Sequence, residues 1–329
     1  METTENNIQT NAAEAPVIPE LSAIRKVMEE MGKVLIGKPE VIECLIVALI
    51  SGGHVLIEDV PGTGKTTIAA ALGKATGLDC RRVQFTPDVM ASDITGFTMF
   101  NKETNQFEYK PGLAMCNILL ADEINRTSPK TQSSLLEVME EGKVTVDGNT
   151  YEVPTPFMVI ATQNPLGFVG THPLPEAQID RFLLKISVGY PEVHEEISII
   201  ADRRNDDPMD HVAQVISGEE IIKIVSMVKD IYIDPTLYKY IVELVTATRS
   251  HSGVLLGASP RASLSLMHVA QAVAFLNGRD YVIPTDITKQ FHHAISHRIT
   301  LNQEAKINKL TVNEILTEIL ETVPAPIKE

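Results

Sequence analysis

The chain has 329 residues, of which 44% are hydrophobic and 22% are charged, and its formal net charge is −15. This length is enough for two domains with a sizeable core. The acidic balance and the absence of any Lys/Arg-rich run disfavour nucleic acid as a partner, because nucleic-acid binding needs a basic face. Tryptophan is absent and aromatic residues make up 5%, so no base-stacking platform is evident.

Two features of the sequence bear on where the protein works. The first 20 residues lack the basic start and apolar core of a signal peptide, and the longest apolar run, at 44–50, is far shorter than a membrane span. Cys44, Cys80 and Cys116 lie in or beside apolar stretches without metal-type spacing, which is typical of core thiols in a reducing compartment. We therefore expect a cytoplasmic protein without membrane insertion.

Taken in chain order, the first part of the sequence alternates strands with helices. Residues 1–20 are polar and are expected to be disordered. Helical periodicity follows at 21–53 and breaks near Gly37. The predicted strands are 54–60, 81–87, 117–124, 157–165 and 182–190, with helices between them that include 66–77 and 128–142. This order predicts a doubly wound α/β core, a parallel five-stranded sheet flanked by helices.

Two stretches interrupt the alternation, and the last part of the chain lacks strands. Residues 92–112 alternate apolar and polar side chains, and 142–154 contain Asp147-Gly148, a strong hairpin signal; both are predicted to be inserted β-hairpins. Amphipathic helices are predicted at 218–229, 235–251, 260–277, 285–299 and 311–322. The expected domains are an α/β core at 21–191, a linker at 192–217 and a smaller all-α lid domain at 218–329.

The stretch EDVPGTGKTT (58–67) follows a predicted buried strand and opens a predicted helix. That is the context of the phosphate-binding loop G-x-x-x-x-G-K-[ST], whose backbone N–H groups and helix dipole meet phosphate oxygens. Gly62 and Gly64 permit close approach, Lys65 is placed to reach the β- and γ-phosphates of ATP, and the Thr66 hydroxyl is placed to hold Mg²⁺. The alternative is a flexible glycine-rich turn that happens to contain a lysine.

Position 59 departs from the loop signature, because Asp59 stands where the first glycine belongs. We expect this position to demand a permissive backbone, and Asp tolerates left-handed conformations better than most residues. On that view an Asp59→Gly variant binds ATP at least as well as the native chain. A large loss would reveal a structural role for the carboxylate.

Two other predicted strands end in polar residues at the same sheet edge. NILLADEINR ends in Asp122, suited to hold Mg²⁺ through water, and Glu123, suited to polarise the attacking water. The alternative is a solvated acidic pair that caps a helix. In ATQNP, Asn164 lies just past a buried strand, where a neutral amide could position that water; read alone, a turn-forming Asn before Pro165 is the more frequent explanation.

Two arginines are candidates for stabilising transferred phosphoryl charge. Arg181, in PEAQIDRF, lies between a helix and the last strand, and pairing with Asp180 or Glu176 is an equal alternative for it. In GASPRASLSL, Ser259 caps a helix and Arg261 occupies its first turn, where a cation opposes the macrodipole. A local rule broken at a well-formed helix start hints at function, and a plain surface arginine is the alternative.

Other polar residues are interpreted as structural. His293 and His297 share a helix face but lack the glutamate of a zinc-protease motif, so metal binding is disfavoured there. The acidic pairs at 140–141 and 195–196 are interpreted as solvated faces.

In their combination and order, DVPGTGKT, LLADEINR, ATQNP, LPEAQIDRF and the SPRA helix resemble the MoxR-type AAA+ ATPases. Within AAA+ proteins, these belong to the group with one hairpin inserted in helix 2 and another before sensor 1, and the two predicted hairpins fall at the matching places. The resemblance covers residues 20–325, and the aspartate at position 59 also fits the MoxR variation.

The resemblance implies a role for each candidate residue. The implied ATP-binding residues are Ile36, Gly37, Val60, Pro61, Gly62, Thr63, Gly64, Lys65, Thr66 and Thr67, the implied metal ligands are Thr66 and Asp122, and the implied catalytic residues are Lys65, Glu123, Asn164, Arg181 and Arg261. Ile36 and Gly37 would line the adenine pocket. Asn164 would be sensor 1, Arg181 the arginine finger that reaches the nucleotide of a neighbouring subunit, and Arg261 sensor 2 on the lid.

The resemblance also implies ATP and Mg²⁺ as cofactors and a hexameric ring with sites at the subunit interfaces. Such proteins act like chaperones that mature client protein complexes or metal cofactor sites, often beside a von Willebrand factor A-domain partner. The alternatives are the ATPase subunit of a metal chelatase, a P-loop phosphotransferase and a nucleotide-dependent scaffold without turnover. A DNA-directed ATPase is disfavoured by the net charge, although hairpin 142–154 could carry a local contact.

Overall fold

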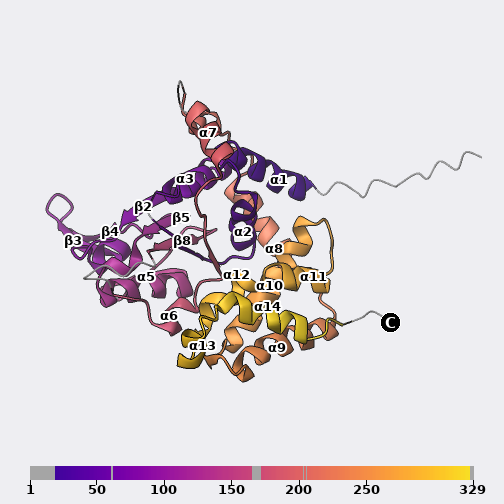
Figure 1. Cartoon of the computed structure of the whole chain (residues 1–329). Coiled ribbons are helices and arrows are strands. Elements are labelled where there is room, and N and C mark those ends of the chain that lie inside the picture. Colours follow the sequence, from indigo (N-terminus) through magenta and orange to yellow (C-terminus); the bar gives the residue numbers. More distant parts are fainter. Residues whose placement is uncertain (1–18, 61, 165–171, 203, 205, 327–329) are drawn as a thin grey trace, which may run out of the picture.

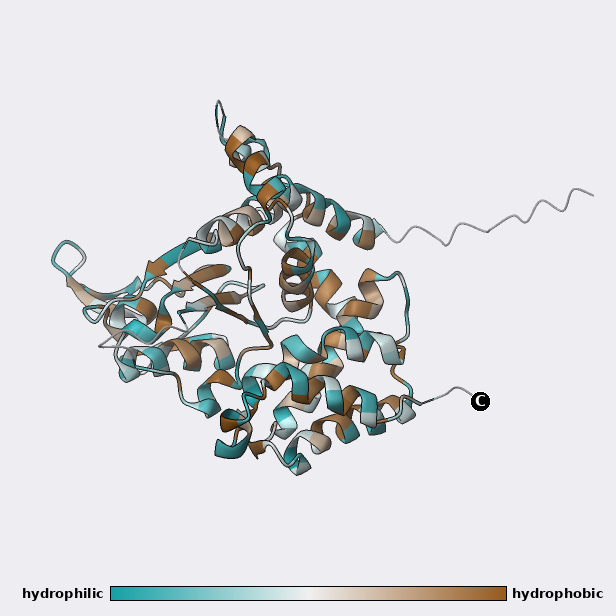
Figure 2. Ribbon diagram, in the orientation of Figure 1, coloured by the Kyte–Doolittle hydropathy of each residue, from teal (hydrophilic) through white to brown (hydrophobic). Residues whose placement is uncertain are grey.

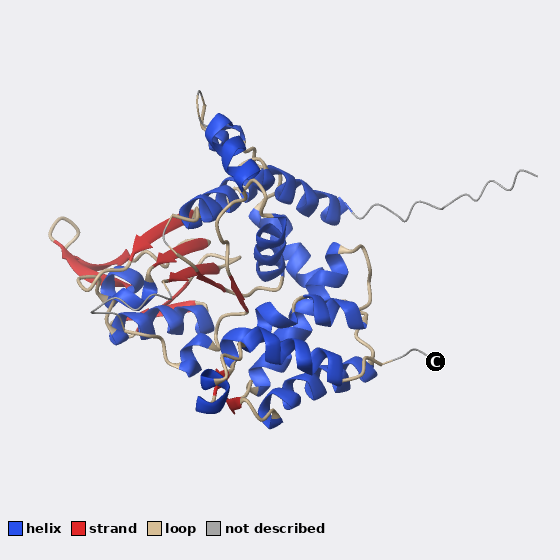
Figure 3. Ribbon diagram, viewed as in Figure 1, coloured by secondary structure: helices blue, strands red, loops and turns tan. Residues whose placement is uncertain are grey.

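The computed structural model describes residues 19–60, 62–164, 172–202, 204 and 206–326; the predicted N-terminal tail, as far as residue 18, and Pro61 lie outside these ranges. A parallel five-stranded sheet with the strand order β2–β5–β8–β1–β9 forms the core, as predicted (Figures 1 and 3). Its strands are β1 (Val55–Glu58), β2 (Cys80–Gln84), β5 (Ile118–Asp122), β8 (Met158–Gln163) and β9 (Leu184–Ile186). Each predicted strand is present and is shorter than predicted at one or both ends.

Helices cover both faces of this sheet. Successive strand residues face opposite sides, so Ile57 and Leu56 belong to two different hydrophobic clusters. Helices α1 (Pro19–Gly32), α2 (Pro39–Ile50) and α3 (Lys65–Thr76) contribute to the cluster that holds Ile57, and α5 (Pro129–Glu141) to the cluster that holds Leu56. Burial on both faces explains why the inner strands β1, β5 and β8 read as apolar runs, and the helices place hydrophobic residues toward the sheet (Figure 2).

Both predicted hairpins are present. Helix α4 (Ala91–Thr95) leads into the antiparallel pair β3 (Gly96–Asn101) and β4 (Gln106–Pro111), which projects beyond the sheet at the left of Figure 1. The second pair is β6 (Lys143–Val146) with β7 (Asn149–Glu152). The rings of Tyr109 and Tyr151 stack with centroids 3.9 Å apart, so the two hairpins contact each other.

Four short elements complete the part of the chain before the lid. Within the core, η1 (Ile124–Arg126) follows β5 and α6 (Glu176–Ile179) precedes β9; between the core and the lid lie α7 (Val193–Asp202) and η2 (Pro208–His211). Helix α7 lies in the region predicted as a linker and projects at the top of Figure 1, with Val193, Ile197 and Ile200 exposed.

The lid is built mainly from the predicted amphipathic helices. Helices α8 (Gly218–Lys229), α9 (Pro235–Ser250), α10 (Pro260–Leu276) and α14 (Val312–Thr322) agree with prediction within one residue at each end, and a short helix α13 (Gln303–Ile307) precedes the last of them. Ser217 and Thr311 form capping boxes with a glutamate three residues later, which explains why two of these helices begin where they do.

Two predictions for the lid are wrong in detail. The helix predicted at 285–299 is divided into α11 (Pro284–Lys289), α12 (Phe291–Ile295) and η3 (Ser296–Arg298). The break falls at Gln290, which leaves the helical region at φ −106° and ψ 7° and accepts a hydrogen bond from the Cys44 thiol. The lid also contains the antiparallel pair β10 (Val254–Leu256) and β11 (Thr300–Leu301), which is too short to leave an alternating pattern in the sequence.

The three cysteines are free, and two of them, Cys44 and Cys116, are buried as expected. Burial raises the pKa of these two thiols to about 12 and that of the half-buried Cys80 thiol to about 11. In the described ranges, none of the helices has the length and apolar character needed to cross a bilayer.

Candidate nucleotide-binding site

The glycine loop connects the end of β1 to the first turn of α3. Gly62 and Gly64 have φ angles of 89° and 83°, in the left-handed region that favours glycine, and the positions where their Cβ atoms would lie are open. Lys65 begins α3, and the exposed Thr66 follows it. The first N–H groups of a helix have no intrahelical partner, so this loop and helix start form a cradle suited to an anion.

Lys65 lies between the loop and the acidic pair. Its Nζ atom donates to the carbonyl oxygen of Asp59 at 2.6 Å. Burial lowers the pKa of Lys65, while the nearby carboxylates of Asp59, Asp122 and Glu123 act in the opposite direction. The predicted loop and the predicted acidic pair therefore meet at the carboxyl edge of the sheet.

Asp59 points away from the loop and toward the chain that leaves β9. Its Oδ1 atom accepts a hydrogen bond from the Val60 N–H at 2.7 Å. Its Oδ2 atom accepts from the N–H groups of Val188 at 2.8 Å and Gly189 at 2.6 Å. Asp59 does not have the left-handed backbone for which a permissive residue was expected, so that expectation is wrong; its carboxylate is held instead by three backbone N–H groups.

The acidic pair is oriented by a residue that sequence reasoning missed. Thr162, in β8, is buried and donates from Oγ1 to Asp122 Oδ1 at 2.6 Å, while the same oxygen accepts from the Glu123 N–H at 2.9 Å. The parallel register of β5 and β8 pairs Ala121 with Ala161, which brings Thr162 beside Asp122. In the sequence, the only sign of this role is a threonine two positions before Asn164. Its meaning becomes clear only when the register of β5 and β8 is known.

Each acidic side chain also contacts an arginine. Asp122 Oδ2 pairs with Arg82 of β2 at 2.7 Å, and Glu123 Oε2 pairs with Arg126 at 2.6 Å. Glu123 has a φ of 56°, which is unfavourable for a residue with a side chain and turns it sharply out of the line of β5. Oxygen donors from Thr66 and Asp122 at this edge fit the ligand chemistry of Mg²⁺.

Asn164 and Gly37 are two further predicted residues of the nucleotide site. Asn164 is half-buried and directly follows β8. Gly37 has a φ of 71°, and its face is covered by Glu195, because a Cβ atom on Gly37 would collide with the Glu195 carboxylate. The interpretation of Glu195 as part of a merely solvated face is therefore wrong, because its carboxylate lies against Gly37, one of the two predicted adenine-pocket residues.

The two candidate arginines converge on one carboxylate. Arg181 donates to the Leu136 carbonyl at 3.2 Å and forms an ion pair with Glu140 Oε2. Arg261, in the first turn of α10, donates to Glu140 Oε1 at 2.6 Å. Glu140 is therefore more than a solvated helix position, and it replaces Asp180 and Glu176 as the partner of Arg181.

The neighbourhood of Arg181 leaves it with unused hydrogen-bonding capacity. A cavity of about 300 Å³ beside it is lined by α5 and by Gln178. Its buried Nε atom finds no acceptor within the described part of the chain. Burial and the positive charge of Arg261 lower the pKa of Arg181. A second anion that enters here would meet two guanidinium groups at once.

The fold and this site define a P-loop ATPase of the AAA+ class. Residues 54–184 match the model of the ATPase family associated with various cellular activities (AAA), and residues 246–319 match the AAA lid domain. The chain belongs to the MoxR family of these ATPases, as predicted.

Relatives of known sequence and structure agree with this assignment. The chain is 48% identical to the uncharacterized protein YeaC of Bacillus subtilis, over 92% of this chain and 95% of that protein. It is 37% identical to Chaperone MoxR1 of Mycobacterium tuberculosis, over 93% and 83% of the two chains. The crystal structure of a candidate ATPase from Cytophaga hutchinsonii superposes with a TM-score of 0.87 at 39% identity, over 94% of this chain and 96% of that one.

Proposed function

We propose that this AAA+ protein hydrolyses ATP to ADP and phosphate in a Mg²⁺-dependent reaction, as a hexameric ring in the cytoplasm, and uses the cycle to remodel or mature a client protein complex. The observation that carries the proposal is the meeting of the glycine loop and Lys65 with the Asp122–Glu123 pair at one sheet edge. The name of the MoxR1 relative, a chaperone, supports the remodelling role. A von Willebrand factor A-domain protein is the proposed partner, as in the resemblance described above.

In this proposal each residue at the edge has a separate task. The loop N–H groups and Lys65 bind the phosphates, and Ile36, Gly37 and the residues of 60–67 hold the nucleotide. Thr66 and Asp122 would hold Mg²⁺, which neutralises charge on the β- and γ-phosphates when bound. Thr162 fixes the Asp122 carboxylate and the backbone of Glu123. Glu123 then polarises the attacking water, and Asn164 positions it.

The two arginines are proposed to act together on the phosphate of a neighbouring subunit. The guanidinium group of Arg181 contacts one oxygen of Glu140 and that of Arg261 contacts the other. Both groups therefore lie against the same part of α5. A terminal phosphate that arrives there from the next subunit would replace Glu140 as their common partner. Charge stabilisation of this kind is worth about 10³- to 10⁵-fold in rate.

Turnover is expected to depend on assembly. Phosphate release per subunit should rise with protein concentration and reach a plateau once rings form, because each site lacks its arginines in an isolated subunit. Steady-state phosphate release, run beside size-exclusion chromatography with and without ATP, measures both quantities. A P-loop phosphotransferase would instead show constant activity per subunit and need an acceptor, and turnover that survives removal of Mg²⁺ by EDTA would contradict the metal role.

The Glu140 contact leads to a second expected result. Glu140→Gln removes the charge that competes with anions for the arginines, so inhibition of hydrolysis by sulfate should set in at about two- to fivefold lower concentration, the effect of one exposed ion pair. The matched control is Glu243→Gln, which removes an exposed helical ion pair with Lys239. Equal sulfate sensitivity of both variants and the native chain would show that Glu140 does not restrain the arginines.

A further inference from the structure

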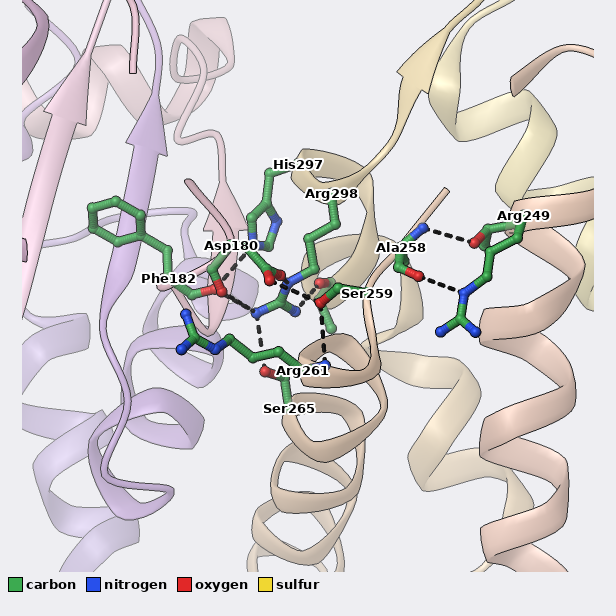
Figure 4. Close-up of polar contacts among 11 residues, drawn as sticks. Asp180, Phe182, Arg249, Ala258, Ser259, Arg261, Ser265, His297 and Arg298 are labelled. Carbon is green, nitrogen blue, oxygen red and sulfur yellow. Dashed lines mark hydrogen bonds and ion pairs between the residues drawn. The ribbon is translucent and has the colours of Figure 1, made fainter. Parts of the chain in front are cut away.

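The short segment that carries Arg181 is held on both sides by the lid. Arg298, in η3, donates from Nε to Asp180 Oδ1 at 2.7 Å and from Nη2 to the Phe182 carbonyl at 2.8 Å (Figure 4). His297 lies within 2.9 Å of the same carbonyl through Nε2. The residues immediately before and after Arg181 are therefore fixed by lid side chains.

The same carboxylate reaches the helix that carries Arg261. Asp180 Oδ2 accepts a hydrogen bond from Ser259 Oγ at 2.8 Å, and Ser259 Oγ accepts in turn from the Arg261 N–H at 3.1 Å (Figure 4). Ser259 is the N-cap of α10, so its position sets where the first turn of that helix begins. Asp180 is thus joined directly to Arg181 by a peptide bond and to the first turn of the Arg261 helix by the Ser259 hydroxyl.

The Arg298 side chain is buried in this contact and the Asp180 side chain is partly exposed. Arg298 is 1% exposed, and its remaining hydrogen bonds go to the Asp180 carbonyl at 3.2 Å, the Ala294 carbonyl at 2.5 Å and Ser265 Oγ at 2.9 Å. Burial lowers the pKa of Arg298 to about 10 against the attraction of Asp180, so the guanidinium stays charged at neutral pH. A buried guanidinium whose nitrogens all donate to fixed acceptors has one favourable geometry, which makes the contact with Asp180 a rigid connection.

We propose that Asp180, Ser259 and Arg298, the core–lid clamp, position Arg181 and Arg261 relative to each other, so that both reach the same phosphate. The inference rests on the proposed function of the two arginines. It assigns a positioning role to three further residues that contact no nucleotide themselves. Loss of the clamp moves the arginine segment and the α10 start independently. Misplacement of about 1 Å is enough to cost about 100-fold in rate.

Asp180→Asn tests this inference against a matched control. The variant keeps the shape of the side chain but removes its charge, and we expect kcat to fall about 10- to 100-fold while binding of a fluorescent ATP analogue stays within about twofold. The control is Asp286→Asn, which breaks a comparably buried lid pair, Arg279–Asp286, whose side-chain hydrogen bonds stay within residues 279–286. It should lower thermal stability to a similar degree and leave kcat near the native value.

Mixing subunits separates positioning from simple structural damage. Because the clamp acts through arginines that serve a neighbour, Asp180→Asn subunits mixed with Glu123→Gln subunits should regain activity at sites where an intact clamp faces an intact Glu123. A variant that damages its own site regains nothing. If Asp180→Asn does not yield soluble protein, Arg298→Lys and Ser259→Ala give milder versions of the same test.

Three outcomes decide the matter. Lost turnover with recovery on mixing supports the clamp. Turnover within twofold of the Asp286→Asn control, or loss without recovery on mixing, overturns it. If Arg181→Ala mixed with Glu123→Gln also fails to recover activity, the proposed action of Arg181 in a neighbouring site has failed, which distinguishes that failure from failure of the clamp.

Discussion

Replacing Arg181 by alanine is expected to slow ATP hydrolysis about 1,000-fold and to leave ATP binding within about twofold of the native value. The reason lies in where the side chain points. Arg181 contacts Leu136 and Glu140 of α5, whereas Lys65 and the Asp122–Glu123 pair form the phosphate edge of its own subunit. A cation directed at another subunit contributes to turnover and not to binding of nucleotide by its own chain. Single-turnover hydrolysis and equilibrium ATP binding measure the two effects separately.

The decisive form of this experiment uses two inactive variants. Arg181→Ala subunits retain Glu123, and Glu123→Gln subunits retain Arg181, so a mixed ring contains interfaces with both intact groups. We expect activity to reappear on mixing in proportion to the number of such interfaces. Arg25→Ala serves as a control, because Arg25 also donates to a backbone carbonyl, that of Leu276, but lies away from the site. Full turnover by a monomeric Arg181→Ala protein would refute the assignment.

The second large effect is expected at Asp59. Asp59→Gly leaves the N–H groups of Val60, Val188 and Gly189 without their carboxylate partner, and the position is 7% exposed, so water replaces it incompletely. We expect the free energy of unfolding to fall by about 2–4 kcal/mol and ATP affinity to fall with it, because unpaired buried donors cost about 1–3 kcal/mol each. This reverses the expectation drawn from the sequence.

A second Asp→Gly change provides the comparison for Asp59. Asp147 has a φ of 49° in the turn of the β6–β7 hairpin, where glycine is well tolerated, so Asp147→Gly should change stability little. Denaturant unfolding and ATP-binding isotherms of the two variants measure the difference. If Asp59→Gly binds ATP as tightly as the native chain and unfolds at the same denaturant concentration, the carboxylate contacts contribute neither to ATP binding nor to stability.

How far the sequence predicts the structure depends on whether the information is local. The strands around 118–122 and 158–163, both hairpins and most lid helices follow from periodicity, turn residues and caps, all of which act over a few neighbouring positions. The break at Gln290 was not predicted, and the Gln290 side chain contacts Cys44, 246 positions away, which no local pattern records.

The same limit applies within the site. Lys65, Asp122 and Glu123 are predicted from motif spacing, and the structure brings them to one edge of the sheet. Thr162 and Glu140 were missed or misread, because their partners come from other elements and only the packing of the core and the lid brings them together. Side chains that position others leave a weaker pattern in a sequence than side chains that bind a common ligand.

The shared use of Glu140 by two guanidinium groups has a consequence for ion selectivity. Glu140 already partners both guanidinium groups, and Glu137 and Glu141 line the same cavity, so an anion that enters has to compete with carboxylates. An incoming anion has to attract the two arginines more strongly than Glu140 does before the arginines release Glu140. Monovalent ions such as chloride gain too little from this exchange, whereas a polyphosphate terminus carries enough charge at short range to complete it. In the proposed ring, Glu140 would therefore set a charge threshold that the terminal phosphate of a nucleotide passes and weaker anions do not.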